Sequence, residues 1–96
     1  MFDKMKELME MKKQADQIKR DLDAMIVEST DVRGIKVVVN GSQTFKSVEI
    51  EDYLVTVENK KRLEADLARA LNTAVSKSQK MAAAKMKDIM PGFPGL

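Results

Sequence analysis

The side chains available for chemistry in this chain are carboxylates, hydroxyls, lysines and arginines, because the sequence contains neither cysteine nor histidine. This composition excludes disulfides, thiolate nucleophiles, most zinc sites and the commonest general base. Ser76 and Ser78 have no neighbouring base that could activate a hydroxyl. The acidic residues Glu49, Glu51 and Asp52 resemble the water-facing positions of a strand more than a metal site. We therefore expect a protein that is not an enzyme, with no catalytic residues, metal, cofactor or small-molecule substrate.

Positive charge is concentrated in the last third of the chain, although the formal net charge is only +2. Residues 3–23 carry six basic and six acidic side chains, and residues 24–59 carry three basic and six acidic ones. Residues 60–88 carry eight basic and three acidic side chains. The distribution of charge, rather than its sum, favours a cationic surface in this last segment.

Within these segments the basic residues recur at helical spacing. In the last third, five of them share one helical face opposite the apolar residues, with Asp66 as the main acidic interruption. At about 1.5 Å per residue this row extends over about 37 Å. In the opening segment a shorter row recurs every seven residues beside a parallel acidic row. The two rows are Arg62, Arg69, Lys77, Lys80 and Lys87, and Lys6, Lys13 and Arg20.

A row of cations on an exposed helix can neutralise successive phosphates of a DNA duplex and release counterions. Binding of this kind depends steeply on salt and weakly on base sequence. The chain has no recognition-helix motif and no aromatic platform for stacking bases. However, the charges of any solvated helix gather opposite its apolar face, so periodicity alone does not distinguish a DNA-binding row from an ordinary solvated surface.

The first row requires a helix, and the apolar residues around it predict one over residues 3–23. From Leu8 to Met25 they are spaced by three and four residues alternately, which is the heptad pattern of a helix that packs against another helix. This seam could pack within the chain or against a second copy, and the small core of a 96-residue chain favours a homodimer. Methionines are interpreted as filler of the core and the seam. The seam comprises Leu8, Met11, Ala15, Ile18 and Leu22.

Strands are predicted between the two helical segments. Residues 25–30 are rich in β-formers, residues 35–40 alternate between apolar and polar side chains, and residues 45–51 resume this alternation. The dipeptide Asn40-Gly41 predicts a hairpin with a type I′ turn. Together these segments predict a three-stranded antiparallel meander.

A second long helix is predicted from the N-cap residue Asn59, or alternatively Thr56, to residue 90. At about 45 Å it is longer than a domain of this size can cover, so part of it should project or lie against a partner. Pro91 ends the helix, and residues 91–96 form a flexible tail rich in proline and glycine. The apolar stripe comprises Leu63, Leu67, Leu71, Ala74, Ser78, Ala82 and Ile89.

The predicted fold is therefore α+β, with the order α-β-β-β-α, a three-stranded antiparallel meander flanked by two long helices, and a single domain over residues 1–90. The N-terminus is charged from its third residue, unlike a signal peptide, and no apolar run approaches the length of a membrane span. We expect a soluble, cytoplasmic protein without a membrane partner.

Over nearly its full length the chain resembles the YbaB/EbfC family of nucleoid-associated proteins. The resemblance rests on residues 9–15, 35–41, 48–50, 63–67, 70–74 and 91–96, in this order and spacing. It implies a bacterial protein that forms a tweezer-like homodimer with protruding helices and binds double-stranded DNA with little sequence preference. It also implies a place in the nucleoid, where such proteins contribute to nucleoid organisation and to regulation of gene expression. Family DNA contacts are attributed to the helices, and we assign them here only to the eight basic residues of the two rows.

A second hypothesis is a protein-interaction adaptor or chaperone-like clamp. In that case the Met-rich seam, rather than the basic rows, would carry the function. Capture of a partner that is insensitive to salt and abolished by Met11→Asp, but not by Lys80→Glu, would favour it.

Overall fold

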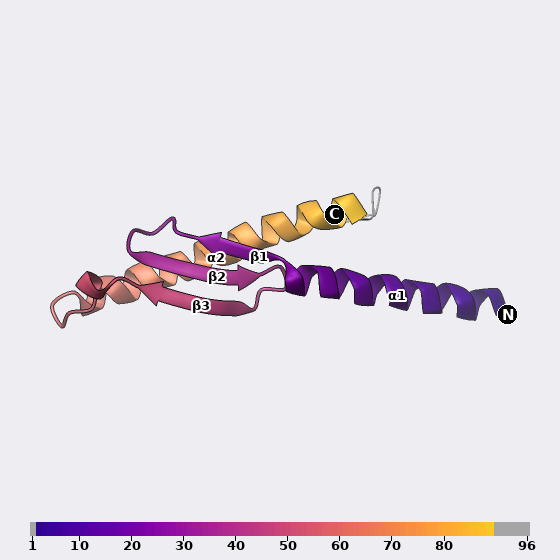
Figure 1. Cartoon of the computed structure of the whole chain (residues 1–96), viewed down its shortest axis with the longest axis horizontal. Helices are drawn as coiled ribbons and strands as arrows, with labels where there is room; N and C mark the ends of the chain where they lie inside the picture. The colour runs from indigo at the N-terminus through magenta and orange to yellow at the C-terminus, as the bar shows by residue number, and fades with distance from the viewer. Residues whose placement is uncertain (1, 90–96) are drawn as a thin grey trace.

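The computed structural model describes residues 2–89, which form two long helices and a three-stranded sheet (Figure 1). The predicted α+β class and α-β-β-β-α order are confirmed. The predicted tail at residues 91–96 lies outside the described residues. The elements are α1 (Phe2–Ala24), β1 (Ile26–Ser29), β2 (Ile35–Asn40), β3 (Phe45–Ile50), the single-turn 3-10 helix η1 (Asp52–Leu54) and α2 (Lys60–Ile89).

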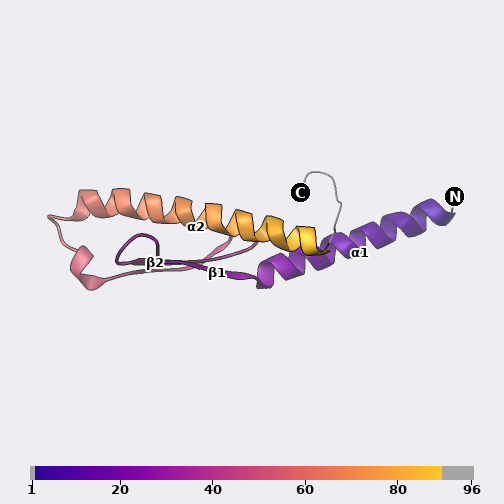
Figure 2. The same cartoon turned by 90° about the horizontal axis from the view of Figure 1, so that it is seen from above.

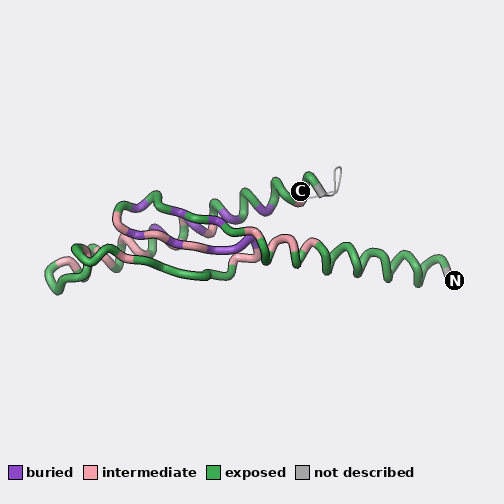
Figure 3. The backbone as a smooth tube through the Cα atoms, in the orientation of Figure 1, coloured by how far each residue is buried: buried purple, intermediate pink, exposed green. Residues whose placement is uncertain are grey.

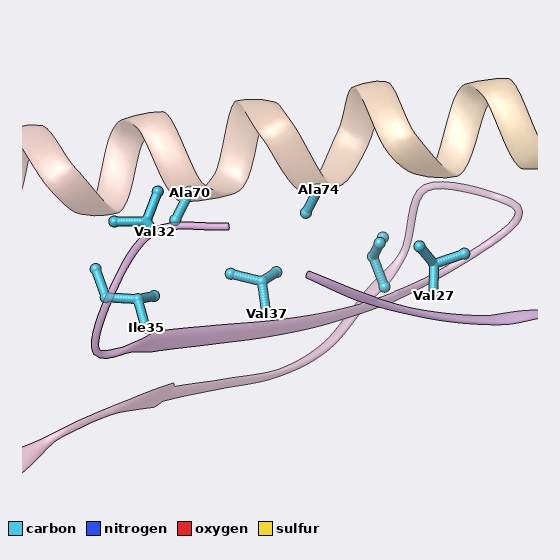
Figure 4. Close-up of a cluster of buried hydrophobic side chains, with 7 residues drawn as sticks. Val27, Val32, Ile35, Val37, Ala70 and Ala74 are labelled. Carbon is cyan, nitrogen blue, oxygen red and sulfur yellow. The ribbon is translucent and has the colours of Figure 1, made fainter. Parts of the chain in front are cut away.

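The sheet is the predicted antiparallel meander, with strand order β1-β2-β3. Alternate residues of the central strand β2, Ile35, Val37 and Val39, are buried beneath α2, which lies along one face of the sheet (Figure 2). Figure 4 shows Val37 and Ala74 facing each other between the sheet and α2. This core consists of valine, isoleucine and alanine, and none of the described methionines is fully buried. The methionines therefore do not form the centre of the core in the single protomer, although Met25 is partly buried against it.

Helix α2 packs closely on the sheet because its central line carries small side chains. Ala70, Ala74, Ser78 and Ala82 recur every four residues and are buried. The leucines of the predicted stripe, Leu63, Leu67 and Leu71, are only half-buried beside this line. Small residues at the contact let a helix approach its neighbour closely, so the middle of α2 lies along the sheet, whereas residues 83–88 of its last turns are mostly exposed, as expected from its length.

The projecting element is α1, which continues the long axis of the molecule away from the sheet (Figures 1 and 3). Residues 3–17 are all exposed, and the described part of the chain extends over 68 × 20 × 17 Å. Most of the stability of helices in proteins comes from packing of an apolar face, and the exposed apolar side chains of α1 have no such packing within the described protomer. None of the helices in residues 2–89 is both long and apolar enough to span a membrane.

The turn between β2 and β3 differs from the predicted two-residue turn. Residues 41–44 form it, and the positive φ angle, 68°, falls on Gln43 rather than on Asn40 or Gly41. The Asn40 Oδ1 atom accepts hydrogen bonds from the backbone N–H groups of Ser42 and Thr44, both at 2.9 Å. The hairpin is thus confirmed, but the type I′ prediction is wrong because the asparagine side chain organises a longer turn.

This turn also anchors the end of α1. The backbone N–H of Gly41 donates to the carbonyl oxygens of Leu22, at 2.9 Å, and Met25, at 3.1 Å. A Cβ atom at Gly41 would lie only 2.8 Å from the Leu22 oxygen, so the close approach requires glycine. The Ser42 hydroxyl also donates to the carboxylate of Asp23. The direction of the α1 arm is therefore set by the β2–β3 turn.

Candidate nucleic-acid interface

The predicted basic row of α2 lies on the exposed surface, where we call Arg62, Arg69, Lys77, Lys80 and Lys87 the α2 track. Three members, Arg69, Lys77 and Lys80, line an open hollow of about 710 Å³. Its remaining lining residues are Asp31, from the β1–β2 loop, and Asn72, Thr73 and Ser76, from α2. Hydroxyl and amide donors beside cations suit a phosphate group, which accepts several hydrogen bonds at once.

The two arginines of the track share one carboxylate. Asp66 lies 3.9 Å from Arg62 Nε and 3.1 Å from Arg69 Nη2. The side chains of Arg62 and Arg69 are 82% and 67% exposed, whereas that of Asp66 is 19% exposed. Ion pairs at such exposure contribute only about 0–1 kcal/mol. The carboxylate thus orients both guanidinium groups and leaves them accessible to a further anion.

The lysines of the track differ in how firmly they are held. Lys77 Nζ donates to the carbonyl oxygen of Glu28 in β1, at 2.9 Å, which fixes this ammonium at the β1 edge of the molecule. Lys80 and Lys87 have no carboxylate within 4.0 Å among residues 2–89. Their charges are therefore free to meet an anion without breaking an ion pair in that part of the protein.

The basic row of α1, Lys6, Lys13 and Arg20, is exposed along the projecting arm. Arg20 Nη2 donates to the Gln17 side chain at 3.1 Å. The arm leaves the body at the β2–β3 turn, whereas Arg62 and Arg69 flank the β1–β2 loop at the other end of β2. A single protomer therefore does not bring the two predicted rows onto one surface.

The seam residues divide into two groups. Leu8, Met11 and Ala15 are exposed, Leu8 and Met11 each at 63%, whereas Ile18 and Leu22 near the root of the arm are half-buried. Only the last part of the predicted seam is thus covered within the chain.

Sequence reasoning missed several residues of the surface that the fold assembles around the track. Asn72, Thr73 and Ser76 follow Arg69 by three, four and seven residues, a spacing that places them on its helical face and could have identified them. Arg33 and Tyr53 join Arg62 and Arg69 at a second hollow, and they come from separate loops. No local pattern in the sequence connects these loops to α2.

The acidic residues do not form a metal-ligand cluster in the part of the chain that the structure describes. No group of three or more carboxylate, histidine or cysteine side chains lies together within residues 2–89. Glu49 is instead paired with Lys36 on the neighbouring strand β2, and the Lys36 Nζ atom lies 4.0 Å from the Glu49 carboxylate.

The whole chain is similar to known proteins. The model of the YbaB/EbfC DNA-binding family matches residues 1–93. A protein of Dictyoglomus thermophilum named as a nucleoid-associated protein is 30% identical over 94 residues, which cover 97% of this chain and 90% of the relative. A nucleoid-associated protein of Chloroflexus aurantiacus is 32% identical over 88 residues, covering 91% and 88% respectively.

Among solved structures, the uncharacterised protein HP0035 of Helicobacter pylori has the same fold. The two structures superpose with a TM-score of 0.65 at 23% identity, over 86% of this chain and 98% of that one. With the family match over nearly the entire sequence and relatives of similar length, the chain belongs to the YbaB/EbfC DNA-binding family.

Proposed function

We propose that this protein binds double-stranded DNA through the α2 track, as a homodimer and with little preference for base sequence. The observation that carries the proposal is the hollow where Arg69, Lys77 and Lys80 lie beside the donors Asn72, Thr73 and Ser76. Membership of a DNA-binding family and relatives named as nucleoid-associated proteins support it.

The dimensions of the track suit a duplex. From Arg62 to Lys87 it extends over about 37 Å, which corresponds to about 11 base-pair steps of B-DNA. Its middle and end carry Lys77, Lys80 and Lys87. Ammonium groups act on phosphates as point charges and lack the planar fork with which arginine recognises base edges. Contacts of this kind position a protein on DNA without reading its sequence.

The uncovered side chains of α1 support a homodimer. Leu8 and Met11 are each 63% exposed, on a helix whose residues 3–17 are all exposed in the described chain. We assign this face to a second copy of the chain, because its heptad spacing is that of a self-associating helix. The edge strand β3, with Phe45 and Val48 partly exposed, offers a further apolar surface to the partner.

A dimer with two α2 tracks can contact two segments of DNA, or one segment twice. Either arrangement would compact or coat DNA, so we place the protein in the nucleoid, with roles in nucleoid organisation and regulation of gene expression. Neither the family nor the surface around the track suggests an enzyme, and we propose none.

Fluorescence anisotropy with two unrelated duplexes at several salt concentrations tests DNA binding. We expect similar affinities for both duplexes and a steep fall with salt. Absence of binding at about 50 mM salt would refute the proposal, since phosphate contacts are strong under that condition. A parallel molar-mass measurement tests the dimer. A monomer would leave the Met-rich seam free and favour the adaptor or clamp hypothesis.

A further inference from the structure

A second hollow, of about 570 Å³, lies where the β1–β2 loop, η1 and the first turns of α2 meet. Val32, which is buried, and Leu54, which is half-buried, supply its apolar lining. Its polar lining residues are Arg33, Tyr53, Asn59, Arg62, Asp66 and Arg69. Three guanidinium groups therefore surround this hollow against a single carboxylate.

The guanidinium groups come from two separate elements. Arg62 and Arg69 are oriented by Asp66 on α2, whereas Arg33 reaches the hollow from the β1–β2 loop. Arg33 has no carboxylate within 4.0 Å among residues 2–89. Arginine binds phosphate oxygens in a bidentate manner and is the preferred residue for this geometry. The electrostatic arrangement thus favours a phosphate group.

An aromatic ring stands at the same hollow. Tyr53 is 62% exposed, and its hydroxyl lies against Gly34, where a Cβ atom would be only 2.9 Å from the oxygen. Gly34 has a φ of +85°, and an added Cβ would lie 2.6 Å from Leu54 Cδ1. The absence of a side chain at Gly34 therefore lets η1 pack against the β1–β2 loop and hold the ring in place.

Backbone contacts keep this arrangement fixed. The N–H of Glu51 donates to the Gly34 oxygen at 2.9 Å. The Asn59 side chain donates to the Leu54 oxygen at 2.8 Å, which joins η1 to the start of α2. The elements that carry the aromatic ring and the arginines are thus joined to one another by hydrogen bonds, rather than being independent loops.

We propose that this hollow binds an unpaired nucleotide, with its phosphate on the arginines and its base stacked against Tyr53. The proposal rests on the proposed DNA binding, because Arg69 lines both hollows, which are therefore neighbours along α2. A strand held on the α2 track would bring an unpaired end to this corner. Stacking of a base on an aromatic side chain is worth about 1–3 kcal/mol and tolerates any base, which agrees with binding that does not read sequence.

Binding at the ring can be observed directly, because Tyr53 is the single tyrosine of the chain and can be labelled selectively. Full-length protein labelled with fluorotyrosine would give one fluorine NMR signal. It would be titrated with a blunt duplex, with the same duplex carrying a short single-stranded overhang, and with thymidine monophosphate. We expect the overhang to shift the signal and to raise affinity about five- to 150-fold over the blunt duplex, the factor that one stacked base provides.

Two variants complete the test. Tyr53→Ala should abolish the gain from the overhang and leave blunt-duplex affinity unchanged, whereas Tyr53→Phe, which keeps the ring, should retain it. Arg33→Ala should reduce the gain in affinity from the overhang, although this variant keeps the Tyr53 ring. If thymidine monophosphate shifts the fluorine signal and the overhang does not, the hollow binds a free nucleotide from solution instead of the end of a DNA strand.

The outcomes separate this proposal from the proposed function. Equal affinity for blunt and overhanging duplexes, with an unmoved fluorine signal for all three probes, would overturn the nucleotide site and leave duplex binding intact. Failure of both duplexes to bind would refute the proposed function. The response of the fluorine signal to thymidine monophosphate would then show whether the hollow binds a nucleotide.

Discussion

Reversal of one charge on the α2 track gives the sharpest test of the proposed DNA interface. Lys80 lines the larger hollow, is exposed, and has no carboxylate within 4.0 Å in residues 2–89. Lys80→Glu therefore removes a cation without disturbing the core or a described ion pair. Its effect on folding should stay within about 0.5 kcal/mol, as for other surface substitutions.

The size of the expected change in salt dependence follows from counterion release. Each phosphate contact steepens the dependence of log affinity on log salt by about 0.9. Between about 50 and about 200 mM salt, one contact thus accounts for about a 3.5-fold loss of affinity. A dimer that uses both tracks loses two contacts in the Lys80→Glu variant. Over the same range of salt, the factor by which affinity falls should therefore be about 12 times smaller for this variant than for the unmodified protein.

The assay is fluorescence anisotropy with two unrelated duplexes at each salt concentration. Lys46→Glu is the matched control once light scattering shows that its molar mass equals that of the unmodified protein, because Lys46 is an exposed lysine on β3, away from the track, and the change of charge is identical. The variant should weaken binding to both duplexes by the same factor. Identical salt slopes for Lys80→Glu and Lys46→Glu would refute the assignment of the track, and a change in the ratio between duplexes would refute non-specific binding.

Three further predictions concern the seam of α1, the contact between the end of α1 and the β2–β3 turn, and the core. Met11→Asp should convert a dimer to a monomer by light scattering, whereas Gln17→Asp, about 120° around α1 from Met11 and outside the seam, should not; dimers in both variants would exclude the seam as the interface. Gly41→Ala should lower the free energy of unfolding by about 1–3 kcal/mol in urea denaturation, since the added Cβ meets the Leu22 oxygen at 2.8 Å. Ser78→Ala should cost about 1–3 kcal/mol in the same measurement, because the buried hydroxyl donates to the Asn40 oxygen at 2.7 Å; an unchanged midpoint would show that water replaces the hydroxyl.

The surroundings of Ser78 also link the track to the arm. Its hydroxyl accepts a hydrogen bond from Gln43 Nε2 at 3.1 Å, on the β2–β3 turn that holds Leu22 through Gly41. Helix α2 and the end of α1 are thus fixed to the same turn. The angle between the α2 track and the projecting arm is therefore a property of the protomer, and the spacing of two tracks in a dimer depends on it.

The local pattern of the sequence determined the elements and the face on which each charge lies. Alternation at Ile35, Val37 and Val39 predicts a strand with one buried face, and the structure buries these residues. The helical spacing of Arg69, Lys77 and Lys80 predicts a common exposed face, and all three line one hollow. Periods of two and 3.6 residues are set by backbone geometry alone, so they can be recognised without knowledge of the fold.

The tertiary structure decided which helix projects and which loops meet the track. The small residues Ala70 and Ala74 let the middle of α2 lie along the sheet, whereas most of α1 projects away from it (Figure 2), and the helical pattern of neither segment distinguishes these two placements. Likewise, Arg33 and Tyr53 line one hollow with Arg62, and Gly34 lets Tyr53 and Leu54 approach the β1–β2 loop closely. Such contacts join residues far apart in the chain and depend on close packing in three dimensions, which no local pattern encodes.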